Sequence, residues 1–249
     1  MPVPVPYCGP AAVPDDLWHR WNTDPFLLSG LGLLLLWAVF RPSARQLTAA
    51  FGAWCILVLG FVSPLCALSS ALFTARVVHH VLLIGLAAPL LVLGGLRWPR
   101  GLLAAVPVHA VAVWAWHAPT IYAAALAHDG LYWLMQSSLL LTAIWFWAGA
   151  LRNHAASLGG VAALVGTMAQ MTMLGALITF APRPLYVPHL ATTQAWGLSP
   201  LEDQQLAGVV MLVPAGLLYL IPILWMLGSW IHRSGAGAAL HPGSGGART

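Results

Sequence analysis

Charged residues are scarce in this sequence of 249 residues, and lysine is absent. Only 6% of the residues are charged and 60% are hydrophobic, whereas roughly 25% of the residues in an ordinary soluble domain are charged. This composition excludes a water-soluble globular domain and predicts a protein embedded in the lipid bilayer. The arginines lie singly between apolar runs and form no continuous basic stripe, so we expect no nucleic-acid partner.

Cysteine is also sparse. The three cysteines, Cys8, Cys55 and Cys66, lack a paired spacing such as C-x-x-C, so no disulfide framework is readable from the sequence. Residues 1–22 begin with a Pro-rich stretch and carry neither the basic start nor the apolar run of a signal peptide. We therefore expect the first spanning helix to direct membrane insertion. The arginine distribution described below predicts that residues 1–22 lie outside the cytoplasm.

The sequence motifs of several enzyme classes are missing as well. There is no Gly-rich phosphate loop with its lysine, no H-E-x-x-H and no G-x-S-x-G. These absences argue against a hydrolase or an ATPase, and we expect a protein that is not an enzyme.

Long apolar windows dominate what is present. A helix needs about 20 mainly apolar residues to cross the hydrocarbon layer. Windows that approach or exceed this length lie at about residues 23–40, 46–66, 74–95, 101–117, 131–150, 157–181 and 200–231. The sequence therefore predicts an all-α fold in which residues 23–231 form a bundle of seven transmembrane helices. Residues 232–249 are Gly-rich and predicted to be a disordered tail, because their apolar surface is too small to offset the entropy of ordering.

Capping signals mark three of the helix starts. Ser43 and Gln46 have the spacing of a capping box, in which two side chains satisfy backbone donors at a helix start. Ser199 and Glu202 repeat this spacing, with a proline at the first helical position. Asp24 is followed by a proline and predicts the cap of the first helix.

Arginine is distributed unevenly between the alternate loops, and cytoplasmic loops carry the excess of positive charge. One side holds Arg41, Arg45, Arg97, Arg100, Arg152, Arg233 and Arg248, and the other holds Arg20, Arg76 and Arg183. This asymmetry predicts an N-terminus outside and a C-terminus in the cytoplasm. All the acidic residues lie on the Arg-poor, outer side: Asp15, Asp16, Asp24, Asp129, Glu202 and Asp203.

Histidine is frequent for so apolar a chain, and neutral imidazole is a common metal ligand. His79 and His80 lie one turn inside the outer end of the third window, and His117 lies at the outer end of the fourth. Asp203 lies in the first turn of the last window, where stabilisation of the helix dipole is an equal alternative to a functional role. These residues form a candidate metal site at the outer face, whereas a surface role is favoured for His128.

Other candidate ligands have structural explanations that weigh more. His109 lies midway along the fourth window, where packing against a neighbouring helix is favoured over a proton relay. Met168, Met171, Met173 and Met211 carry thioethers of the kind that bind Cu(I), but core filling is the favoured interpretation. No role is assigned to the histidines of loops and termini, which are His19, His154, His189, His232 and His241.

Several segments, in this order and spacing, resemble the CtaG-type cytochrome c oxidase assembly proteins of bacterial membranes. These segments are Trp21 with Asp24 and Pro25; Ser63, Pro64 and Leu65; Phe73 to Leu83 (FTARVVHHVLL); Ala88 to Gly94 (APLLVLG); Trp116, His117 and Pro119; and Trp196 to Pro214 (WGLSPLEDQQLAGVVMLVP). The resemblance implies a multi-pass protein of the bacterial inner membrane that helps to mature a haem-copper oxidase. It further implies copper as the cofactor and an oxidase subunit as the partner.

The sequence departs from the family pattern at the implied copper site. The family carries an H-M-x-x-H signature at the third helix, where this sequence has Arg76, Val77 and His80. A second histidine pair of many relatives corresponds here to Tyr132 and Gln136.

The departure leaves two interpretations of the outer site open. Arg76 and His80 share a helix face, so the guanidinium charge opposes a cation bound at His80. Either His79 supplies a further ligand, or Arg76 pairs with Asp203 in place of a metal, and the ion pair is slightly favoured. Further residues that could support or substitute for the ligands are Asp24, Gln204, Met171 and Met211.

Two other functions stay possible at this point. A scaffold of the same fold could hold an oxidase subunit without any metal. A haem-binding redox protein would need two axial ligands that face each other, for which His109 with His79 or His80 are the candidates.

Overall fold

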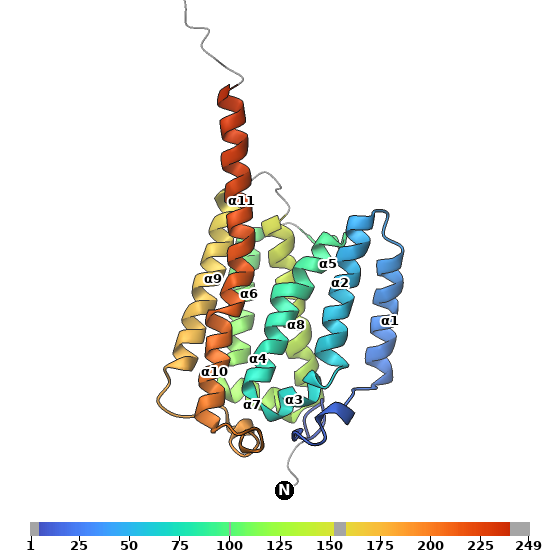
Figure 1. Cartoon of the computed structure of the whole chain (residues 1–249), viewed down its shortest axis with the longest axis vertical. Coiled ribbons are helices and arrows are strands. Elements are labelled where there is room, and N and C mark those ends of the chain that lie inside the picture. Colours follow the sequence, from blue (N-terminus) through green and yellow to red (C-terminus); the bar gives the residue numbers. More distant parts are fainter. Residues whose placement is uncertain (1–4, 100, 152–157, 240–249) are drawn as a thin grey trace, which may run out of the picture.

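The computed structural model describes residues 5–99, 101–151 and 158–239, and all the regular elements within these ranges are helical. Most of the helices stand side by side in one bundle, and the N-terminal segment lies at one end of it (Figure 1). We call this end the N-terminal face. The predicted all-α class is confirmed over the described residues.

Helix α1 spans Pro25–Val39, α2 Ala44–Phe61, α3 Leu65–Ala71, α4 Phe73–Val81, α5 Ala88–Leu93, α6 Leu102–His117, α7 Pro119–Ala127 and α8 Asp129–Leu151. Helix α9 spans Leu158–Thr179, α10 Pro200–Leu212 and α11 Pro214–Ala239. Shorter elements are η1 (Leu17–His19), η3 (Val187–His189) and η4 (Gln194–Trp196), and the π-helical η2 (Leu82–Ala87) joins α4 to α5.

Five helical runs in the described residues are long and apolar enough to cross a membrane: Ala44–Phe61, Phe73–Leu93, Asp129–Leu151, Leu158–Thr179 and Pro200–His232. Helices α6 and α7 pass the same test together, although they are bent by 74° at their junction. Helix α1 is apolar but has only 15 residues. A polytopic membrane protein is thus supported by five candidate spans, while the seventh span and the orientation remain predictions.

Local caps begin the helices largely as the sequence predicts. The Asp24 carboxylate accepts the backbone N–H groups of Phe26 and Leu27 at 2.8 and 3.2 Å. Ser199 and Glu202 form a complete capping box at the start of α10. Only half of the other box forms: Ser43 accepts the N–H of Gln46 at 3.3 Å, but the side-chain oxygen of Gln46 has no hydrogen-bond partner.

Two predicted windows are divided by breaks. The second ends at Phe61 instead of residue 66, because Ser63 bonds the carbonyl of Leu59 and receives the N–H of Leu65, which starts the separate helix α3. The last window is divided between α10 and α11 ahead of Pro214, whose ring cannot donate the next helical hydrogen bond. The first of these breaks adds the short helix α3 at the N-terminal face (Figure 1).

The far end of the chain departs from the predicted boundary. Helix α11 continues to Ala239, past the end predicted at residue 231, and residues 240–249 of the predicted tail lie outside the described residues. Arg100, Arg152, Arg248, His154 and His241 also lie outside the described residues.

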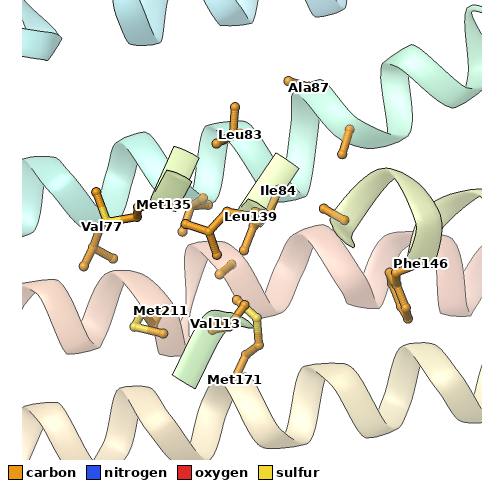
Figure 2. Packing of buried hydrophobic residues seen from close by; sticks show 14 of the residues in the cluster. Val77, Leu83, Ile84, Ala87, Val113, Met135, Leu139, Phe146, Met171 and Met211 are labelled. Atoms are coloured by element: carbon orange, nitrogen blue, oxygen red, sulfur yellow. The ribbon is translucent and has the colours of Figure 1, made fainter. Parts of the chain in front are cut away.

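The core lies between α4, η2, α6, α8, α9 and α10 (Figure 2). Met171 and Met211 are both buried members of this core, which agrees with the core-filling role that was favoured for them. The indole of Trp147 in α8 donates to the carbonyl of Ile84 inside η2 at 2.8 Å. This bond satisfies a buried carbonyl where the π-helical turn interrupts the regular ladder.

A disulfide joins Cys8 to Cys66 across 58 residues, with a Cα–Cα distance of 5.3 Å. The spacing of the cysteines did not indicate this pair, which the fold brings together. The pairing depends on the break at Ser63, which starts α3 and turns Cys66 toward the N-terminal segment. Disulfides persist in oxidising compartments, which agrees with the predicted placement of the N-terminal face outside the cytoplasm.

Candidate functional site

The N-terminal segment packs against part of the N-terminal face (Figure 1). Tyr7 stacks on Tyr132 with ring centroids 4.8 Å apart, and its hydroxyl donates to Asp24 at 2.8 Å. This bond, together with the backbone bonds of the cap, lowers the pKa of Asp24, while burial raises the pKa of Tyr7. The Cys8 sulfur lies 3.5 Å from the Tyr132 hydroxyl. Asp24 thus helps to anchor the segment that covers Tyr132.

His80 and His117 lie together inside the bundle. Helices α4 and α6 place their rings 5.6 Å apart, nearly perpendicular, and both side chains are buried. Nδ1 of His117 lies 2.7 Å from the carbonyl of Val113; because a carbonyl only accepts, Nδ1 carries the hydrogen and Nε2 keeps a free lone pair. Neither nitrogen of His80 has a hydrogen-bond partner. The pair therefore offers unused imidazole lone pairs inside the bundle.

His79 points elsewhere. Its ring packs edge-on against Phe61 of α2 at 4.7 Å, and a Cβ added at Gly60 would lie 3.0 Å from its Nε2. Its centroid is 6.2 Å from that of His80, and both its nitrogens lack partners. Adjacent residues on a helix diverge by about 100°, so His79 turns to α2 while His80 turns to α6.

Asp203 caps a neighbouring helix. Its carboxylate accepts the backbone N–H groups of Phe73 and Thr74 at 2.7 and 3.1 Å, and Thr74 Oγ1 donates to the Asp203 carbonyl at 2.7 Å. These N–H groups are the unpaired donors at the start of α4, where the helix dipole also favours a negative charge. Asp203 therefore ties α10 to α4.

The expected ion pair between Arg76 and Asp203 does not form. Among the described residues, the one ion pair with a nitrogen–oxygen distance within 4.0 Å is that of Arg20 with Asp16, at 2.9 Å. The Arg76 guanidinium lies 5.2 Å from the ring centroid of Tyr132, is fully buried, and none of its nitrogens has a hydrogen-bond partner. The prediction was wrong because the Asp203 carboxylate accepts hydrogen bonds from the backbone N–H groups at the start of α4 instead of pairing with Arg76.

The predicted ligands are thus only partly brought together. Within the described part of the chain, no group of three or more His, Cys, Asp or Glu residues could hold a metal ion. His80 and His117 are the two predicted ligands that lie face to face, whereas His79 and Asp203 are engaged with other helices.

Two other candidates, Gln204 and His109, make hydrogen bonds within the bundle. Gln204 accepts the N–H of Leu185 at 2.6 Å and donates to the carbonyl of Ile178 at 3.2 Å, which fixes the connection after α9. His109 bonds Thr142 at 2.9 Å and lies against Phe146, which agrees with the packing role that was favoured for it.

The assignment of His189 as an inert loop residue missed a buried network. Its Nδ1 donates to the carbonyl of Ala71 at 3.2 Å, and its Nε2 therefore accepts the hydroxyl of Tyr122 at 2.6 Å. The bond links η3 to α3 and α7. No local motif around His189 could have indicated it, because both partners are distant in the sequence.

We expect His189 to make the fold sensitive to acid. Burial, with a smaller contribution from the charge of Arg76, lowers its pKa from 6.5 to about 4. The imidazole of His189 therefore binds a proton more readily in the unfolded chain than in the folded one. The stabilising effect of neutral His189 is present above pH 6.5 and is lost as the pH falls toward 4. Between pH 7 and pH 5 the unfolding free energy should fall by about 2 kcal/mol.

A comparison of variants at the two pH values measures this effect. Denaturation of a His189→Gln protein in detergent should show a smaller loss of stability on acidification than the wild type. A His128→Gln variant, altered at an exposed histidine, should retain the full loss. Equal acid sensitivity of all three proteins would contradict the assignment.

Comparison with known families bears on the whole bundle. The model of the family described as cytochrome c oxidase caa3 assembly factor (Caa3_CtaG) matches residues 96–233, more than half of the chain. The chain belongs to this family. No curated protein and no solved structure matches it.

The Caa3_CtaG match places the site residues in two groups. It includes α6 with His117 and α10 with Asp203, but the matched residues begin after α4. Arg76, His79 and His80 therefore lie outside the part of the chain that defines the family match. The arrangement of these three residues is therefore interpreted from their own contacts.

Proposed function

We propose that this Caa3_CtaG protein assists the assembly of a haem-copper cytochrome c oxidase at the outer face of the bacterial inner membrane. In this proposal His80 and His117 bind copper, which the protein passes to an oxidase subunit. Membership of the family supports the assembly role. The facing imidazoles of His80 and His117 support the copper role, because neither nitrogen of His80 has a hydrogen-bond partner and the bond of His117 to Val113 uses its Nδ1 and leaves Nε2 as an acceptor.

The ligand chemistry favours copper over harder cations. Imidazole nitrogen suits copper and zinc, whereas calcium and magnesium need several oxygen ligands. Within the described residues no third His, Cys, Asp or Glu joins the pair, so these side chains offer a metal only two ligands. A low coordination number and a neighbouring guanidinium both weaken the binding of copper. A protein that passes copper to a partner has to release it, so weak binding suits this role.

Copper binding by purified protein tests this proposal. We expect the wild type in detergent to take up Cu(I) in competition with a chelator, and His80→Ala or His117→Ala to lower the affinity on the order of 100-fold or more. Losing a group that merely orients a ligand already costs about 10- to 100-fold, and these residues are proposed as the ligands themselves.

A matched control is His128→Ala, which removes an exposed imidazole at the same face and should leave the affinity unchanged. If a His80→Ala, His117→Ala double variant bound Cu(I) with wild-type affinity, the assignment of the copper site to these two histidines would be wrong.

A metal-free scaffold is the second candidate, and Arg76 favours it. The permanent charge of Arg76 lies one helical turn from His80 and opposes any cation there. Cells that lack the gene and carry the His80→Ala, His117→Ala variant distinguish the two functions. Oxidase activity that is low but restored by added copper indicates delivery, whereas full activity without added copper indicates a scaffold.

A further inference from the structure

Arg76 carries a buried positive charge that makes no direct ion pair within the described residues. A guanidinium stays protonated in proteins, and a buried charge is costly unless it is paired. The side chain of Arg76 is 0% exposed, and none of its three nitrogens makes a hydrogen bond. The face of the Tyr132 ring, 5.2 Å away, provides a weak electrostatic attraction and no counter-charge.

Every acidic side chain of the protein has a different role. The sequence contains six acidic residues, and all lie within the described ranges. Asp15 and Asp129 are exposed. The others are engaged: Asp16 with Arg20, Asp24 and Glu202 in their own helix caps, and Asp203 at the start of α4. Among the described residues no carboxylate lies within 4.0 Å of the Arg76 guanidinium, so a directly paired counter-charge would have to come from outside the chain.

The surroundings of Arg76 are rich in unused hydrogen-bond donors. Gln136 lies one turn from Tyr132 on α8, is 1% exposed, and has no partner for its amide. His80 lies one turn from Arg76 on α4 and is also unpartnered. The contact between Arg76 and Tyr132 brings these two helix faces together. A guanidinium, a primary amide and an imidazole N–H match an anion, which accepts and never donates.

We propose that a small inorganic anion of halide size binds between α4 and α8, with Arg76 and Gln136 as its donors. The size follows from burial, because Arg76, His80 and Gln136 are each 2% exposed or less. Tyr7, stacked on Tyr132, and the Cys8–Cys66 disulfide lie above the site. A carboxylate of a partner protein would have to displace this cover.

The anion site goes beyond the proposed function and does not depend on it. The Arg76 guanidinium lacks a direct partner whether or not copper binds at His80 and His117. If copper does bind there, the anion offsets the repulsion between the guanidinium and the metal. Failure of copper binding would therefore leave the anion proposal intact, and the two are measured separately.

Thermal unfolding in detergent tests the proposal. Chloride replaces gluconate stepwise at constant ionic strength, because gluconate is too large for the site. A ligand that binds only the folded state raises the melting temperature, here by on the order of 5 °C at saturating chloride. Arg76→Gln should abolish the dependence on chloride. Gln136→Leu should shift the half-effective chloride concentration upward by about tenfold, as expected for one lost hydrogen bond to a charge.

The matched control is Arg183→Gln, which removes an exposed arginine near the same face and should keep the full chloride response. If Arg76→Gln does not fold, crystals of the wild type grown with bromide decide the matter, since an anomalous peak is expected within hydrogen-bond distance of the guanidinium. Equal stability of the wild type in chloride and gluconate, or ordered water instead of bromide beside Arg76, would overturn the proposal.

Discussion

A Cys8→Ser variant is expected to lose about 4 kcal/mol of unfolding free energy. The disulfide to Cys66 closes a loop of 58 residues, and removing a cross-link of this length restores much of the conformational entropy of the unfolded chain. Chemical unfolding in detergent of the wild type and the variant measures the difference. Cys66→Ser should give the same loss, because either change opens the same loop.

The control for this prediction is Cys55→Ser, which alters the exposed free cysteine of α2 and should leave stability unchanged. Reduction of the wild type should reproduce the Cys8→Ser loss and have no further effect on that variant. A Cys8→Ser protein as stable as the wild type would show that the remaining contacts of Tyr7 with Tyr132 and Asp24 suffice to hold the segment.

Helix starts were predictable because their causes are local. Asp24, Ser199 and Glu202 satisfy backbone donors within three residues of themselves, and the structure forms these caps as expected. The bend between α6 and α7 was not predicted, because the apolar character of the residues on both sides of Pro119 gives no indication of direction. Hydropathy predicts that a segment enters the membrane and not the path it takes.

The site was predictable only in part, for the same reason. His80 and His117 were both expected at one face, and they meet. The role of Asp203 was misjudged, because the sequence does not show that the first N–H groups of α4 lie within reach of α10. The disulfide and the bonds of His189 also join distant segments whose approach depends on the packed bundle.

Gly208→Ala is expected to destabilise the protein by about 3 kcal/mol, because α9 and α10 are in contact at this residue. A Cβ at position 208 would lie 2.1 Å from Thr179 Oγ1, 2.6 Å from the carbonyl oxygen of Gly175 and 2.8 Å from the Thr179 nitrogen. Two of these atoms belong to the backbone, so a change of side-chain rotamer cannot relieve the overlap and the helices must separate. Close approach of backbones through small residues is a common basis of helix packing in membranes.

Gly216→Ala provides the matched control, since a Cβ there meets nothing within 4 Å, and it should stabilise α11 by up to about 1 kcal/mol through helix propensity alone. Unfolding of both variants in mixed detergent micelles measures the contrast. The Gly208 variant should also weaken Cu(I) and chloride binding, because Asp203, on the same helix, caps α4, which carries Arg76 and His80. A Gly208→Ala protein of wild-type stability would show that α9 and α10 can separate without cost.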